Sequence, residues 1–296
     1  MNSQILAFSD YLRFEKRYSP HTIRAYTDDL CVFFTFIDNT YGQLQLKEIT
    51  GTMVRSWLAS IKEEKSGART INRKISSMKS FFKYQLKLGE IISSPMGQVI
   101  SPKLNKRLPN FIKENETETI FKHLEFGTDW KGQTNKLILK LLYQTGMRLS
   151  ELINLKSTAV DFHKMQLKVL GKGNKERILP INADVAVEIR NYESEKKKAF
   201  NNFESTFLLL TPAGKKLYAG YVYQVVKWHL SQATTIQKKS PHVLRHTFAT
   251  HMMNNGADLN AVKDLLGHAS LAATQVYTHN TIEKLKNVHK KSHPKA

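Results

Sequence analysis

The sequence predicts a mainly α-helical protein with a small β-sheet, divided into two domains. Its 296 residues are too many for one small core and suit two. Apolar residues recur at helical spacing over most of the chain, while residues 165–181 alternate in the manner of a strand pair. Residues 93–110 interrupt the helical pattern with serine, proline and basic side chains, as an extended linker does. We therefore expect an N-terminal helical domain at 1–92, a basic interdomain linker at 93–110 and an α+β domain at 111–296.

The N-terminal domain is expected to be a bundle of four helices. Ser19 and Pro20 suit the N-cap and first turn of the second helix, and Gly89 suits a left-handed residue that ends the fourth. Each helix carries an apolar stripe and the loops are short, which is the pattern of a bundle. The four helices are predicted near residues 5–12, 20–37, 51–66 and 68–88. Cys31, the single cysteine, lies in an apolar run and is predicted to be a small core residue.

The charge composition points to nucleic acid. Lysine and arginine number 45 against 25 aspartates and glutamates, which gives a net charge of +20. An excess of this size favours a polyanionic partner. No apolar run approaches the roughly 20 residues that span a bilayer, and the first residues lack the basic-then-apolar layout of a secretory signal. We expect a cytoplasmic protein that binds double-stranded DNA and has no membrane anchor.

The N-terminal domain and the linker supply the expected DNA contacts. The exposed face of the fourth helix is basic, and polar residues lie near helix starts, where side chains and backbone N–H groups can hold phosphates. The predicted DNA-binding residues are Thr22, Arg24, Arg69, Thr70, Asn72, Arg73, Lys74, Lys79, Lys103, Lys106 and Arg107.

The second domain is predicted to combine helices with one hairpin. Helices are expected near residues 120–124, 137–143, 149–155, 184–198, 221–233, 241–252 and 259–266. Residues 165–169 and 177–181 form the hairpin around a turn at Gly171–Asn174, which places Lys172 at or beside its exposed tip. Asn255–Asp258 contains the signals that end one helix and cap the next.

The stretch Ser240–His251 carries the first functional signal. Ser240 suits an N-cap whose hydroxyl accepts backbone N–H bonds, and Pro241 suits the first helical position. His242 and Arg245 are three residues apart, so both project from the first turns of this helix. Because the free N–H groups of a helix N-terminus favour an anion, we expect a phosphate beside these two side chains.

Further candidates come from segments before and after this stretch. Arg148 lies at a helix start, where a cation opposes the helix dipole, which indicates an anionic partner. Glu151, one turn later, is a candidate for holding the guanidinium in position. The remaining candidates are Lys172 in its glycine-flanked turn, His268 and Tyr277.

These groups suit metal-free chemistry on a phosphodiester. They include no carboxylate cluster for Mg²⁺ and no set of histidines or cysteines at zinc spacing, so neither a metal nor a cofactor is expected. Arginine forks can clamp the non-bridging oxygens, and histidines can move protons near neutral pH. Tyr277 would be the nucleophile, and Lys172 could protonate the leaving oxygen.

Several segments closely resemble the signature motifs of the tyrosine site-specific recombinases, the phage integrase family. In order, they are Thr145–Leu152, Gly171–Arg177, His242–His251, and Leu265–Ser270 with Tyr277–His279. The resemblance covers the whole chain and implies a core-binding domain at 1–92 and a catalytic domain at 111–296. It implies that Tyr277 attacks DNA to give a 3′-phosphotyrosyl intermediate and a free 5′-hydroxyl, without metal or ATP. It also implies roles for the other candidates: transition-state stabilisation by Arg148, Arg245 and His268, proton transfer by His242, and general acid catalysis by Lys172.

Within the family, the compact length and the tail at 284–296 look most like the bacterial Xer type, which resolves chromosome dimers. In such proteins four protomers assemble on two DNA sites, and the C-terminal segment docks on a neighbouring protomer. The neighbour here is a second copy or a paralogue, and an activating partner protein is compatible with this interpretation. Three alternatives stay open: an integrase or invertase of a mobile element, a type IB topoisomerase, and a non-catalytic DNA-binding accessory protein. The presence of all six candidate residues argues against the last.

Overall fold

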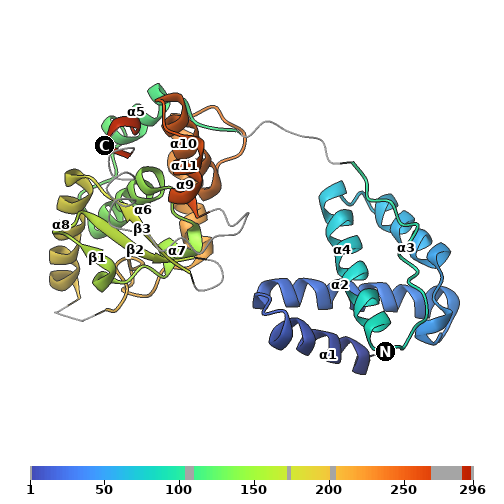
Figure 1. Cartoon of the computed structure of the whole chain (residues 1–296). Coiled ribbons are helices and arrows are strands. Elements are labelled where there is room, and N and C mark those ends of the chain that lie inside the picture. The colour runs from blue at the N-terminus through green and yellow to red at the C-terminus, as the bar shows by residue number, and fades with distance from the viewer. Residues whose placement is uncertain (1, 104–109, 172–174, 201–204, 268–288, 295–296) are drawn as a thin grey trace. The chain divides into compact units, whose positions relative to one another are not determined.

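The computed structural model of the chain describes residues 2–103, 110–171, 175–200, 205–267 and 289–294. Within these ranges the secondary structure is helical apart from one small sheet, so the predicted fold class is confirmed. The chain divides into two compact units, Met1–Arg107 (unit 1) and Leu108–Ala296 (unit 2). Figure 1 labels the helices and strands of each unit.

Unit 1 contains the four predicted helices. They are α1 (Asn2–Asp10, continued by a π-helical turn at Tyr11–Glu15), α2 (Pro20–Tyr41), α3 (Gly51–Glu63) and α4 (Ala68–Lys87), with a 3₁₀ turn at Leu46–Glu48. α2 begins at Pro20 because the hydroxyl of Ser19 accepts a hydrogen bond from the backbone N–H of Thr22 at 3.2 Å. Just beyond α4, Gly89 has a φ of +74°, a left-handed conformation that glycine adopts without strain.

Aromatic side chains fill the core of unit 1. Phe33, Trp57 and Phe81 are at most 1% exposed. Phe33 packs edge-on against Trp57 with ring centroids 5.0 Å apart, which is a favourable arrangement for two aromatic rings. The same core includes Met96 and Val99, two residues of the stretch predicted as linker. The packing of unit 1 therefore extends past residue 92.

The prediction that Cys31 is a core residue is wrong, because its side chain is exposed. The buried apolar stripe of α2 in this region is Leu30, Phe33, Phe34 and Ile37. Successive side chains of an α-helix are rotated by about 100°, so Cys31 falls beside this stripe on the solvent side. Val32 is 50% exposed for the same reason.

Unit 2 packs its helices around one central helix, α6 (Trp130–Thr145). The others are α5 (Glu114–Lys122), α7 (Leu149–Ile153), α8 (Ala183–Ala199), α9 (Ala219–Ala233), α10 (Pro241–Asn254) and α11 (Leu259–Leu266), with a 3₁₀ turn at Ser157–Ala159. α6 contacts α7, α8, α9 and α10, and its residues Leu139, Leu141 and Leu142 are fully buried. The apolar run at 137–143 is thus the middle of the unit. None of the helices described in either unit is long and apolar enough to cross a membrane.

The sheet of unit 2 is antiparallel with the order β1 (Val160–Asp161), β2 (Gln166–Leu170), β3 (Glu176–Pro180). Its register pairs Leu167 with Leu179 and Val169 with Arg177. Leu167 and Val169 are buried, so this face of the hairpin points into the core. The predicted strand pair is confirmed, and the predicted turn is described only as far as Gly171, whose N–H donates to the carbonyl of Lys175 at 2.8 Å.

The junction between α10 and α11 follows the predicted stop and cap. Gly256 has a φ of +83°, which ends the path of α10. The carboxylate of Asp258 then accepts hydrogen bonds from the backbone N–H groups of Asn260 (3.0 Å) and Ala261 (3.1 Å) at the start of α11. α11 then ends at Gly267, which has a left-handed φ of +61°, and that end lies at the candidate site.

Candidate active site

The turn between α6 and α7 positions Arg148. Gly146 ends α6 with a φ of +61°, and Arg148 is the N-cap residue of α7. The carboxylate of Glu151 accepts hydrogen bonds from the backbone N of Arg148 at 2.6 Å and from its Nη1 at 2.9 Å. Glu151 thus holds the arginine that lies at an electrostatically unfavourable helix start.

Arg245 projects from the first turns of α10 and is 7% exposed. Its Nη1 donates to the carbonyl of Gly146 at 2.6 Å, and its Nη2 donates to the carbonyl of Leu266. A guanidinium has five N–H donors, so these two bonds leave further donors for a ligand. Backbone carbonyls from two separate segments therefore fix this guanidinium in place.

Three arginines bind the C-terminal end of α11. The pairs are Arg177 Nε with Leu265 O (3.0 Å), Arg245 Nη2 with Leu266 O, and Arg148 Nη2 with Gly267 O (2.6 Å). The last carbonyls of a helix have no partners within it and form the negative end of its dipole, so they bind cations well. The end of α11 and the three guanidinium groups consequently hold one another in one arrangement.

The cations of the site affect one another's titration. Burial and, after it, the nearby Arg148 and Arg177 lower the pKa of Arg245 to about 9, which leaves its guanidinium protonated at pH 7. Burial also lowers the pKa of His242, and the charges of His246 and Arg245 act in the same direction. The imidazole of His242 is therefore neutral at pH 7 and can accept a proton.

The start of α10 differs from the prediction in one detail. Ser240 is the N-cap residue and Pro241 the first helical residue, but the serine hydroxyl makes no capping bond. The backbone N of Val243 donates instead to the carbonyl of Ser240 at 2.9 Å. The side chain of Ser240 is buried, so it faces the interior rather than the first turn of the helix. The predicted cap by its hydroxyl is wrong.

Arg177 is a residue of this site that the sequence-based prediction missed. It lies on β3 opposite Val169 and is 5% exposed. Its Nη1 and Nη2 both donate to the carboxylate of Glu151, the latter at 2.7 Å. A signal was present in the sequence, because Leu167 and Val169 mark the inward face of the hairpin. An arginine on that face requires a buried anion.

The carboxylate of Glu151 is fully engaged. Burial favours its neutral form, but hydrogen bonds from Arg177 and Arg148 outweigh burial and hold its pKa below the usual value. Four N–H donors occupy its two oxygens, which matches the lone-pair positions of an ionised carboxylate. Glu151 therefore stays ionised and supports two arginines rather than carrying protons.

The structure brings together four of the predicted site residues, Arg148, Glu151, His242 and Arg245. The other three, Lys172, His268 and Tyr277, lie outside the described residues. Among the residues that are described, no three His, Cys, Asp or Glu side chains form a group that could hold a metal ion. The described part of the site is thus a cluster of fixed cations beside a neutral imidazole.

The predicted DNA-binding residues of unit 1 differ in their surroundings. Arg24, Arg69, Lys79 and Lys103 are exposed, Thr70 is half-buried, and Lys106 and Arg107 lie outside the described residues. The hydroxyl of Thr22 lies 2.9 Å from that of Ser19, and Nδ2 of Asn72 donates to the carbonyl of Pro102 at 3.0 Å. These last two side chains therefore have structural partners within unit 1.

Arg73 and Lys74 bind the buried carboxylate of Asp29. Nζ of Lys74 lies 3.2 Å from Oδ1, Nη1 of Arg73 contacts Oδ2, and the hydroxyl of Ser77 donates to Oδ2 at 3.2 Å. The side chain of Asp29 is 2% exposed, whereas that of Lys74 is 12% and that of Arg73 is 42% exposed. The role of Lys74 is thus to neutralise the buried Asp29, whereas the side chain of Arg73 is still partly exposed to solvent.

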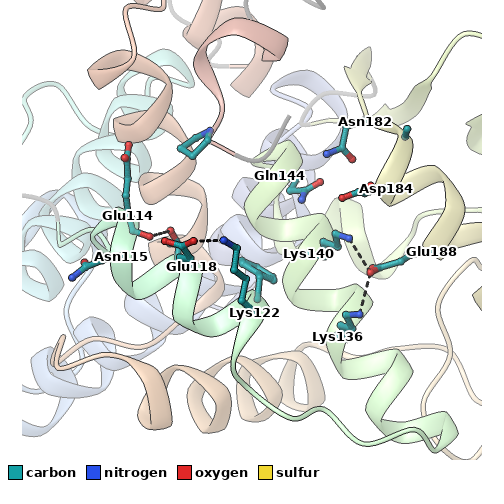
Figure 2. Close-up of a pocket in the computed structure, with 14 residues that line it drawn as sticks. Glu114, Asn115, Glu118, Lys122, Lys136, Lys140, Gln144, Asn182, Asp184 and Glu188 are labelled. Carbon is teal, nitrogen blue, oxygen red and sulfur yellow. Dashed lines mark hydrogen bonds and ion pairs between the residues drawn. The ribbon is translucent and has the colours of Figure 1, made fainter.

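A separate hollow of about 720 Å³ lies between α5, α6 and α8, with Pro294 among the residues that line it. Figure 2 shows that the three lysines of its wall are paired with Glu118 and Glu188. Lys136 and Lys140 both contact Glu188, at 3.2 and 2.8 Å, and Lys122 contacts Glu118. None of the described candidate catalytic residues lines this hollow. It is therefore distinct from the arginine cluster.

The C-terminal segment 289–294 packs against its own unit. Nε2 of His289 lies 2.7 Å from the carbonyl oxygen of Gln144 on α6. The ring of His289 stacks on that of His293 with centroids 5.2 Å apart, and the ring of His293 lies 4.8 Å from that of Tyr143. Phe248 of α10 contacts both histidines. The segment expected to dock on a neighbouring protomer thus docks in cis in the single chain.

Comparison with known proteins identifies the same organisation. Residues 110–284 match the model of the phage integrase family, and residues 5–89 match that of the phage integrase N-terminal SAM-like domain. The chain is 38% identical over 296 residues to the tyrosine recombinase XerC of Staphylococcus aureus (strain JH9), covering 100% of this chain and 98% of the relative. It is 35% identical over 314 residues to XerC of Chlorobaculum parvum (strain DSM 263 / NCIMB 8327), covering 98% and 94%.

Two solved structures share the fold. The site-specific recombinase XerH bound to a palindromic difH substrate, in a post-cleavage complex, has a TM-score of 0.72 at 23% identity, covering 90% of this chain and 78% of that one. The Tn1549 transposon integrase in complex with transposon right end DNA has a TM-score of 0.71 at 18% identity, covering 95% and 97%. At these identities the likeness establishes the fold alone. Because one family model matches more than half of the chain and the relatives match it from end to end, the chain belongs to the phage integrase family of tyrosine recombinases.

Proposed function

We propose that this chain is a site-specific DNA recombinase that cuts and rejoins DNA through a covalent bond between Tyr277 and a 3′-phosphate. The observation that carries the proposal is the pair of guanidinium groups of Arg148 and Arg245, fixed by backbone carbonyls beside the neutral imidazole of His242. The full-length similarity to XerC supports recombination as the reaction. It also supports Xer-type resolution of chromosome dimers as the biological role.

In the proposed reaction the hydroxyl oxygen of Tyr277 attacks the scissile phosphorus and the bond to the 5′ oxygen breaks. His242 accepts the phenolic proton, which its lowered pKa permits, and Lys172 gives a proton to the departing 5′ oxygen. The products are a 3′-phosphotyrosyl ester and a 5′-hydroxyl. Attack by the 5′-hydroxyl of a partner duplex restores a phosphodiester and releases the tyrosine. The ester conserves the energy of the broken bond, so the cycle consumes no ATP.

The two arginines suit the negative charge that develops on the non-bridging oxygens. Their positions are set before DNA binds by bonds to Gly146, Leu266 and Gly267, so little reorganisation is needed during the reaction. Charged, planar donors are also the side chains best suited to clamp phosphate oxygens. We assign His268 as a further donor to the same oxygens.

Double-stranded DNA is the proposed partner. The net charge of +20 and the exposed Arg24, Arg69, Lys79 and Lys103 support this assignment. Four protomers, identical or paralogous, would act on two DNA sites, with or without an activating protein. In that assembly residues 289–294 would leave their places on α6 and α10 to dock on a neighbour. We place this reaction in the cytoplasm.

The proposal is tested by trapping the covalent intermediate on a nicked suicide duplex. After cleavage the short end carrying the 5′-hydroxyl dissociates from this duplex, so the strand cannot be rejoined. Candidate sites from the native chromosome and from any adjacent mobile element are incubated with the full chain and scored for an adduct that resists denaturant. We expect an adduct with the wild type and none with Tyr277→Phe, while both bind the duplex equally. An adduct that persists with Tyr277→Phe would remove the assignment. A trap on the mobile-element site alone would contradict the chromosomal role.

A further inference from the structure

We propose that Arg177 is a positioning residue of the active site, which fixes Arg148 through Glu151 and anchors the end of α11. The inference rests on the proposed function, because it concerns how the phosphate-binding arginines are held. Its basis is the set of contacts made by the buried guanidinium of Arg177, which has no role in the proposed reaction as described above.

The guanidinium of Arg177 is directed entirely toward protein groups of the site. Nη1 and Nη2 bind the two oxygens of Glu151, and Nε binds the carbonyl of Leu265 at 3.0 Å. The side chain is 5% exposed, and that of Glu151 is 1% exposed. A group enclosed in this way cannot reach a DNA phosphate, so its influence on the reaction passes through its neighbours.

Two glycines allow the backbone to approach this guanidinium closely. A Cβ atom on Gly267 would lie 3.1 Å from Cδ of Arg177, and one on Gly171 would lie 3.4 Å from its Nη1. In the sequence Gly171 directly precedes Lys172, and Gly267 directly precedes His268. Arg177 therefore lies against the two chain segments that lead into two further residues of the proposed site.

The link from Arg177 to Arg148 runs through one carboxylate. Glu151 binds Arg177 in a two-pronged manner, which fixes the plane of the carboxylate. The fixed carboxylate then accepts two bonds from Arg148, whose side chain is 27% exposed and so only partly enclosed. Without Arg177 the carboxylate can turn toward its one remaining cation and draw it away from the phosphate. A displacement of about 1 Å in a catalytic group costs on the order of a hundredfold in rate.

A double-mutant cycle tests this link. The rate of covalent adduct formation on the suicide duplex is measured in single turnover for the full chain with Arg177→Met, with Arg148→Ala and with both. We expect Arg177→Met to slow the wild-type reaction by about thirtyfold and to leave duplex affinity unchanged within about threefold. In the Arg148→Ala background the same change should alter the rate by less than about threefold, because the positioned group is already absent. Arg190→Met, which removes an exposed arginine of α8, is the matched control and should leave the rate unchanged.

Each possible result supports or overturns the proposal. If Arg177→Met slows adduct formation equally in both backgrounds, Arg177 acts on the fold and the positioning role is overturned. If it slows adduct formation in neither background, the positioning role is overturned as well. If Arg177→Met lacks the circular dichroism of the folded chain, Arg177→Lys replaces it in the cycle, since lysine keeps the charge but cannot grip both carboxylate oxygens. Absence of any wild-type adduct would instead count against the proposed function. If the wild type and Arg177→Met form the adduct at the same rate while Arg148→Ala forms it slowly, the proposed function stands and only the positioning role is overturned.

Discussion

The hydroxyl of Tyr143 lies 3.0 Å from Nδ1 of His251, and Nε2 of His251 lies 2.8 Å from the carbonyl oxygen of Ile112. Because a carbonyl only accepts, Nε2 carries the proton and Nδ1 accepts the hydrogen bond from the tyrosine. Burial lowers the pKa of His251 and raises that of Tyr143, so the pair is uncharged at neutral pH. This bond joins α6, α10 and the segment before α5 in the core of unit 2, and it depends on a neutral imidazole.

Unit 2 is expected to lose stability as the pH falls below about 6.5. Burial lowers the pKa of His229 to about 4 and lowers those of His251 and His289 as well. Each folded-state pKa lies below the unfolded value of about 6.5, so the unfolded chain takes up protons first and the free energy of unfolding falls across that interval. For His229 alone the loss is about 2 kcal/mol at pH 5.

Urea denaturation at pH 7.5, 6.0 and 5.0 measures this effect. His229→Leu should flatten the pH dependence, because the ring is 1% exposed and stacks on Phe126 rather than serving the site. His163→Leu, which changes an exposed histidine of the same unit, should leave the pH dependence unchanged. Identical midpoints at pH 7.5 and 5.0 for the wild type would contradict the prediction.

Gly146→Ala should destabilise unit 2 and disturb the site together. The residue has a φ of +61°, and a Cβ atom there would lie 2.5 Å from Cδ1 of Phe248 and 3.0 Å from Cδ2 of Leu266. Left-handed strain and overpacking together should cost about 3 kcal/mol of unfolding free energy. Gly256→Ala is the matched control in the same unit, because its φ of +83° is also left-handed while nothing lies within 4 Å of its Cβ position. It should cost about 1 kcal/mol, and equal losses for the two variants would show that the contacts with Phe248 and Leu266 do not matter.

The helices could be predicted from the sequence because their signals are local. The cap at Ser19, the left-handed Gly89 and the stop at Gly256 each depend on residues within one turn. The apolar stripes follow from the helical repeat alone. The error at Cys31 has a related cause. A continuous apolar run covers both faces of a helix, and only the spacing of apolar residues over the whole helix shows which face is buried.

The site could be predicted only in part, because its geometry joins distant segments. The pairing of Arg148 with Glu151 spans one helical turn and could be proposed from spacing. The pairing of Arg177 with Glu151 joins residues 26 positions apart and depends on how the hairpin packs against α7. No local pattern predicts that the last carbonyls of α11 receive three arginines, since this needs the relative placement of α7, β3, α10 and α11.

Arg245→Ala should slow covalent adduct formation by at least about a hundredfold, by analogy with the loss of one preorganised oxyanion donor. The expected cause is loss of positive charge at the phosphate, since the guanidinium is protonated at pH 7 and fixed by two carbonyls. Single-turnover rates on the suicide duplex, with duplex affinity measured in parallel, provide the test. A loss below threefold would mean that this arginine serves only to hold Gly146 and the end of α11 together.

Asp29→Asn should destabilise unit 1 while its neighbour Asp28→Asn does not. Asp29 is 2% exposed and binds Arg73, Lys74 and Ser77, so the variant leaves the largely buried Lys74 beside a neutral amide. Removing one partner from a buried ion pair costs about 3 kcal/mol. The carboxylate of Asp28 is 68% exposed and lies 3.9 Å from Arg24, and such surface pairs contribute little.

Thermal unfolding of the two variants is followed by fluorescence in a chain that also carries Trp130→Phe and Trp228→Phe, so that Trp57 in the unit 1 core is the only tryptophan. This measurement separates the two expectations. Lys74 also lies over the ring of Trp57, with Nζ 5.4 Å from its centroid, so a shift of the ammonium should change the emission directly. If Asp29→Asn unfolds at the wild-type temperature, the contacts of Asp29 with Arg73, Lys74 and Ser77 do not stabilise unit 1. Arg73 and Lys74 would then act only in DNA binding. In that case Arg73→Ala and Lys74→Ala should lower duplex affinity by similar factors, and the affinity of each variant should depend less steeply on salt concentration.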